Sequence, residues 1–127
     1  MTSNLDTAEK TILRVVRGER PWTDLRSLGM TGGPEVGRWQ FPASFPADTR
    51  VAVGDLARGL LTHLHDGSRL KEWGTIMEAL PYELVDAESH PEGQTVLNAL
   101  WSASFGDPLS DKEIGVVTRI ASESANR

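Results

Sequence analysis

Apolar residues in the second half of the chain recur at helical spacing, in runs that glycine or proline closes. The first run, residues 54–67, has leucines four residues apart: Leu56, Leu60 and Leu64. The second run, residues 68–80, has a 3-4-3 spacing in Leu70, Trp73, Met77 and Leu80. Gly67 and Pro81 end these runs, and Ser68 is the expected cap of the second. Because this period matches the α-helix and not the strand, the pattern predicts a largely helical protein.

Two more helices are expected towards the C-terminus. Pro91 suits the first turn of a helix, with Ser89 or His90 as its cap. The apolar residues that follow cover a wide arc of this helix: Val96, Leu97, Leu100, Trp101 and Phe105. An arc of this width predicts a central helix with neighbours on two sides and Trp101 in the core. Ser110 to Glu113 has capping-box spacing and predicts the start of a last helix.

The first half of the chain has weaker signals. A helix is expected over residues 6–17 and a short one from Pro21 to Leu28, followed by a long Gly/Pro-rich connection at 30–50. Within and just after that connection, residues 37–41 and 49–53 could pair as a two-stranded ribbon, and 82–87 could form a helical turn. We therefore expect a mostly α, single-domain bundle over residues 1–127. It has five to six helices, the long loop and this small ribbon.

Composition excludes several classes of site. The chain has no cysteine, which removes disulfides, zinc–thiolate sites and thiol catalysis. Its first ten residues are polar, and no apolar run approaches the roughly 20 residues needed to span a bilayer. We expect a cytoplasmic protein without membrane contact, cofactor or metal.

The three histidines are candidate metal ligands and proton carriers. His63 and His65 are two residues apart on one expected helix, so their side chains point in different directions and are unsuited to one metal ion. They are expected to be cations at the helix C-terminus. His90, among acidic residues, is expected to be a cap or turn residue, with a pH switch as the alternative.

No catalytic motif is recognised. The glycines of TGGPEVG, residues 31–37, are not followed by the Lys-Ser/Thr pair of a phosphate-binding loop. They predict an ordinary loop. Serine, histidine and aspartate occur without a nucleophile-elbow motif, so no catalytic residue is assigned.

The charge of the chain is unevenly distributed. Net charge is −5, and residues 72–111 contain eight Asp or Glu but no Lys or Arg. Such a field repels nucleic-acid phosphates and attracts basic surfaces, so direct nucleic-acid binding is not expected. Five of these acidic residues are predicted to meet a basic protein partner: Glu78, Glu83, Asp86, Glu88 and Glu92.

Trp39 is the one tryptophan that we single out as a candidate contact residue. It lies in the irregular connection near Phe41 and Phe45, where an exposed aromatic patch could form. The other three tryptophans are expected in the core.

The segment ESHPEG, residues 88–93, resembles the E-H-P-x-G segment of colicin-type immunity proteins. His90, Pro91 and Gly93 carry the resemblance, with Glu88 displaced by one residue, and the paired tyrosines of that family are absent. The resemblance implies a small acidic helical protein that neutralises a basic nuclease toxin. No contact residue is carried over from it.

The sequence thus supports two functions of different kinds. The first is a non-enzymatic acidic protein-binding module, toxin-neutralising or regulatory, acting on a basic partner. The alternative is a small enzyme, or a ligand-binding or accessory protein, with a pocket between loop 30–50 and the helices. Oligomeric state and the identity of the partner are not predicted.

Overall fold

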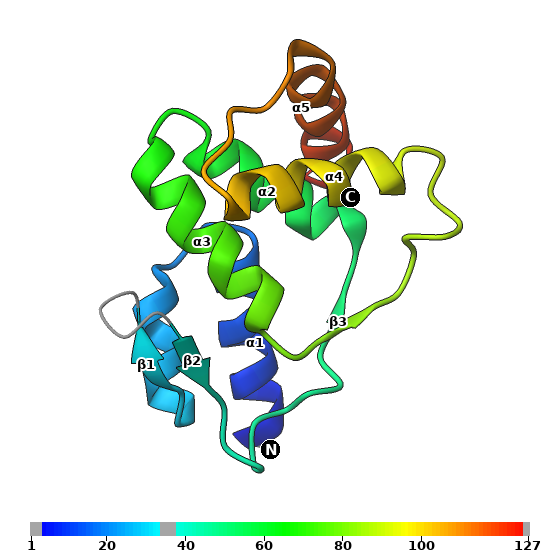
Figure 1. Ribbon diagram of the computed structural model, residues 1–127. Helices are drawn as coiled ribbons and strands as arrows, with labels where there is room; N and C mark the ends of the chain where they lie inside the picture. Colours follow the sequence, from blue (N-terminus) through cyan, green and yellow to red (C-terminus); the bar gives the residue numbers. More distant parts are fainter. Residues whose placement is uncertain (1–3, 34–37, 126–127) are drawn as a thin grey trace.

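Helices dominate the structure. The computed structural model describes residues 4–33 and 38–125. Within them are five α-helices and one 3₁₀-helix: α1 (Asn4–Val16), η1 (Trp22–Leu28), α2 (Val53–His63), α3 (Gly67–Ala79), α4 (Gly93–Ser104) and α5 (Asp111–Ala125) (Figure 1). The predicted mostly α architecture of five to six helices is confirmed. No helix in the described ranges is long and apolar enough to cross a membrane.

Helix α2 is the central helix of the bundle. It packs against α1, α3, α4 and α5, and its Leu56, Ala57 and Leu60 are completely buried. Gly59 lies on the same helix, where the position of a Cβ would collide with the Val16 carbonyl oxygen and with the Trp73 ring. The missing side chain is what lets α1 and α3 approach α2 this closely.

Two small sheets replace the expected ribbon. Strand β1 (Thr31–Gly33) pairs antiparallel with β2 (Arg38–Gln40), and β3 (Arg50–Val51) pairs parallel with β4 (Glu83–Leu84). A two-stranded antiparallel ribbon is therefore present, but the predicted pairing of residues 37–41 with 49–53 is wrong.

The helical turn expected at 82–87 is also wrong at its start. Glu83 and Val85 donate backbone hydrogen bonds of 2.8 and 3.0 Å to the carbonyls of Thr49 and Val51. A strand forms here because β3 supplies these partners, which no local pattern reveals.

Helix starts agree with the sequence where a capping side chain is unambiguous. At α5, Ser110 Oγ accepts from the Glu113 N–H at 3.1 Å, and the Glu113 carboxylate accepts from the Ser110 N–H at 2.9 Å. This confirms the predicted capping box. At α3 the expected cap Ser68 is wrong, because Asp66 accepts from the Arg69 N–H at 3.2 Å and the helix already begins at Gly67.

Helix α4 begins later than predicted, and Pro91 lies outside it. Glu92 is the N-cap residue, and the first helical residue is Gly93. His90 Nδ1 accepts from the Glu92 N–H at 3.1 Å. The interpretation of His90 as a turn residue is supported by this bond, which requires an unprotonated Nδ1.

The tryptophans separate into buried and exposed ones. Trp73 is 2% exposed, and its Nε1 donates to the Val15 carbonyl at 3.2 Å. Trp101 is 58% exposed and Phe105 60% exposed, so the prediction that Trp101 belongs to the core is wrong. The buried face of α4 is formed by smaller residues: Val96, Ala99, Leu100 and Ala103.

Candidate protein-binding surface

Three of the five predicted acidic contact residues are exposed. Glu78 is in the last turn of α3, Glu83 is in β4, and Glu88 lies in the turn at 87–89. None of them forms an ion pair within the described part of the chain. Burial, with the charge of Glu78 in addition, raises the pKa of Tyr82 to about 12. These three carboxylates are therefore available to a partner.

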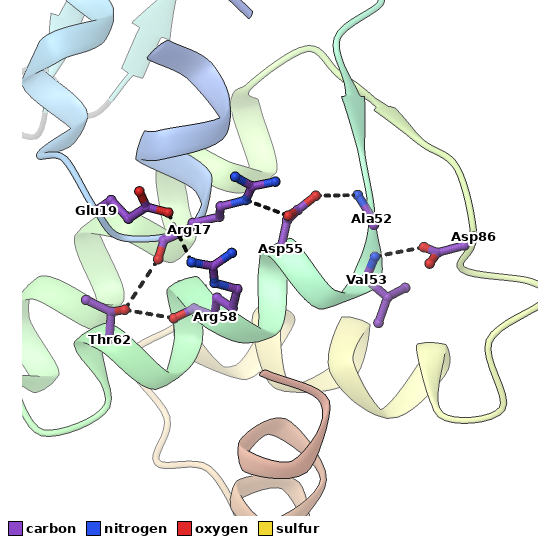
Figure 2. A network of polar contacts seen from close by, with 8 residues as sticks. All are labelled: Arg17, Glu19, Ala52, Val53, Asp55, Arg58, Thr62 and Asp86. Carbon is purple, nitrogen blue, oxygen red and sulfur yellow. Dashed lines mark hydrogen bonds and ion pairs between the residues drawn. The ribbon is translucent and has the colours of Figure 1, made fainter. Parts of the chain in front are cut away.

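The other two acidic residues have partners inside the protein. Asp86 Oδ1 accepts from the Val53 N–H at 2.7 Å and so satisfies a donor at the start of α2 (Figure 2). Glu92 forms an ion pair with Arg119 of α5. A cation from a distant element thus covers part of the acidic stretch.

A polar network ties the segment that follows α1 to α2. Buried Asp55 accepts from Arg17 Nε at 2.7 Å through one oxygen and from the Ala52 N–H at 2.9 Å through the other (Figure 2). Two further contacts join the segment that follows α1 to the middle and the end of α2: Arg58 with Glu19 at 3.2 Å, and Thr62 Oγ1 with the Arg17 carbonyl at 3.3 Å. Each Asp55 oxygen accepts a hydrogen bond, so this network holds α2 to the segment that follows α1.

Trp39 is only partly exposed. It packs against the core from β2, and its Nε1 is buried without a hydrogen-bond partner in the described part of the chain. Phe41 and Phe45 stack edge to face at 4.9 Å, but Phe45 is 5% exposed. An aromatic patch of all three side chains is thus not open to a partner. Residues 34–37 of the TGGPEVG segment lie outside the described residues, and the pocket predicted beside this loop stays a prediction.

A second aromatic pair, which the sequence did not reveal as exposed, is on α4. Trp101 and Phe105 pack edge to face with ring centroids 5.0 Å apart. Gln94 and Asn98 share their face of the helix and are joined by a 2.9 Å hydrogen bond between their amides. The two amides are the sequence signal that would have identified this face as the one turned to water.

The surroundings of this pair favour contact with another protein. Helix α4 contains no charged residue, whereas Asp107 and Asp111 are exposed just beyond it and the stem of Lys71 lies beside Gly106. A largely apolar hollow of about 400 Å³ opens at the same end of α4, where Ala103, Gly106 and Asp107 line it. Trp101 and Phe105 are not among the residues that line this hollow. We call the exposed Trp101–Phe105 pair the α4 surface.

The described residues provide no cluster of three or more His, Asp or Glu side chains placed to hold a metal ion. Comparison with protein families, with curated proteins and with solved structures finds no significant match to this chain. Function must therefore be argued from the surfaces of the molecule itself.

Proposed function

We propose that the protein is a non-enzymatic, protein-binding module that acts in the cytoplasm on a basic partner protein, in a toxin-neutralising or regulatory role. The observation that carries the proposal is the exposed Trp101–Phe105 pair on an uncharged helix. Large aromatic side chains are costly to leave in water and are enriched among the residues that dominate binding energy at interfaces.

Charge supports a basic partner. Glu78, Glu83 and Glu88 are exposed and unpaired within the described residues. Asp107 and Asp111 follow the aromatic pair in the chain and are also exposed, with Lys71 and Lys112 as neighbouring cations. Complementary charge of this kind accelerates encounter and excludes acidic partners, while buried aromatic anchors slow dissociation. In this proposal the aromatic side chains supply most of the affinity, and the acidic side chains speed the encounter.

The test uses a partner captured from the native host with the wild-type protein. Replacing Trp101 and Phe105 together by alanine is expected to weaken its binding by about 100-fold or more, mainly through faster dissociation, as for interface hot spots. Thr118→Ala on α5 is the control, because Thr118 is exposed and belongs neither to the aromatic pair nor to the acidic segment 78–92. Surface plasmon resonance gives both rate constants, and thermal melts verify that each variant is folded.

The proposal fails if the double variant binds like wild type, or if the captured partner is acidic. If partner binding were lost only in Trp39→Ala, the interface would lie at the loop 30–50 and not at the α4 surface.

A further inference from the structure

A small pocket lies where three segments meet: the connection between α1 and η1, the end of α2 and the start of α3. Its volume is about 230 Å³, and its walls include Pro21, Trp22, His63, Arg69, Glu72 and Trp73. A more polar hollow of about 440 Å³ adjoins it and shares Pro21, His63 and Arg69. This space accommodates a small molecule or one long side chain of a larger one.

No cation among the described residues forms an ion pair with Glu72, although Arg69 lines the same pocket. The Glu72 carboxylate accepts a hydrogen bond from the neutral Trp22 indole. The other charged side chains of the pocket and the hollow are paired: Arg69 with Asp66, Glu19 with Arg58, and Arg20 with Asp24. Arg69 is 77% exposed and already paired with Asp66, whereas Glu72 is partly buried and is held by an uncharged donor.

His63 adds a neutral acceptor. Burial, assisted by Arg69, lowers the pKa of its imidazole, while Asp66 and Glu72 oppose the shift. The ring is 5.9 Å from that of Trp73, and it has no hydrogen bond to a described residue. At neutral pH it therefore presents a free lone pair to the pocket.

We propose that this pocket binds the ammonium group of a small organic cation. Glu72 would supply the opposite charge, Trp22 an indole surface for a cation–π contact, His63 a hydrogen-bond acceptor, and buried Trp73 the floor. Trp22 already attracts one cation, because the Arg26 guanidinium lies 5.1 Å from its ring centroid. An anion would have to approach the carboxylate of Glu72.

The first test titrates the full chain with n-butylammonium chloride at constant ionic strength, following the Trp22 and His63 signals by NMR. Saturable shifts of both are expected. Glu72→Gln keeps the acceptor for Trp22 but loses the charge, and should weaken binding about tenfold, the scale of one charge-assisted hydrogen bond. Glu78→Gln is the matched control, since it removes an exposed carboxylate from the same helix outside the pocket, and should bind like wild type.

Three results would overturn the inference: signals that do not move, equal binding by wild type and Glu72→Gln, or saturable binding of benzoate in place of the ammonium ion. The outcome is independent of the α4 surface. The variant without Trp101 and Phe105 should bind n-butylammonium normally, even if the proposed partner does not exist.

Two sources of the ammonium group can be separated. If it is a lysine of the basic partner, which rests on the proposed function, Glu72→Gln weakens partner binding and n-butylammonium competes with the partner. If it is a free amine, Glu72→Gln leaves partner binding unchanged while amine binding is lost.

Discussion

The imidazole of His63 is subject to two opposing effects. The carbonyl end of α2 favours a cation at this position, and the sequence therefore predicted a protonated histidine. Half-burial against Trp73 and the nearby Arg69 favour the neutral form, and they prevail, because the pKa is lowered from its ordinary value of 6.5. The charge state of this residue is set by its neighbours on the next helix, α3.

We expect an NMR titration to find the His63 pKa below 6.5, and lower still in Glu72→Gln, because that carboxylate raises it. Arg69→Gln should raise the pKa. The pKa of His63 is lower in the folded protein than in the unfolded chain. Its contribution to stability is therefore complete at pH values above the unfolded-state pKa, and it is lost as the pH falls from there towards the folded-state pKa. Urea unfolding at several pH values should show a smaller loss in His63→Gln. A wild-type pKa above 6.5 would contradict this account.

At the level of elements, α4 has one buried and one exposed face, and its large aromatics are on the exposed one. We expect Trp101→Ala to change the free energy of unfolding by less than about 1 kcal/mol, as for surface substitutions, and Trp73→Ala to cost roughly 3–5 kcal/mol. Urea melts of the two variants measure this directly. Equal losses would mean that Trp101 is covered within the protein.

The close contact of α2 with its neighbours gives a second prediction. Gly59→Ala places a methyl group against the Val16 carbonyl and the Trp73 ring, and should destabilise by about 1–3 kcal/mol through overpacking. Gly115→Ala on α5 is the matched control, because nothing lies within 4 Å of its Cβ position. It should stabilise by about 0.5–1 kcal/mol through helix propensity. If both variants lost stability equally, close packing around Gly59 would not be the reason for the loss in Gly59→Ala.

Helices could be predicted from the sequence because their signals are local. Apolar spacing predicted the presence of every helix, and the Ser110 capping box gave the start of α5, but the starts of α3 and α4 were misplaced. The β3–β4 pairing could not be predicted, because these two strands are far apart in sequence. The outward position of Trp101 was missed for a related reason: a wide apolar arc does not say which part of it a neighbour covers.

Of the candidate protein-binding surface, only the exposed acidic residues could be predicted from the sequence. Glu78, Glu83 and Glu88 are exposed as the acidic-surface hypothesis requires, whereas Asp86 is engaged by the Val53 N–H and Glu92 by Arg119. Val53 and Arg119 both lie outside residues 72–111, so the sequence of that stretch does not reveal either contact.

Across the whole molecule, Glu78, Glu83 and Glu88 form no ion pair with a described residue, and the one cation that the strand register places opposite them is Arg50, across from Glu83. Their charge is opposite in sign to that of the proposed basic partner. Reversing Glu78, Glu83 and Glu88 to lysine removes that charge without touching the hydrogen bond of Asp86. The melting temperature should move little, because exposed charges contribute little to stability.

Association with the basic partner should then slow by about tenfold or more at low salt, with dissociation nearly unchanged, because steering acts on encounter. The wild-type on-rate should fall as salt rises, and the triple variant should lose most of that dependence. Glu9→Lys, on α1, changes net charge as much as any single reversal and controls for a non-local effect. If Glu9→Lys slowed association as much as Glu88→Lys, net charge and not this surface would steer the encounter. An on-rate insensitive to both salt and the triple reversal would leave the α4 surface alone to account for binding.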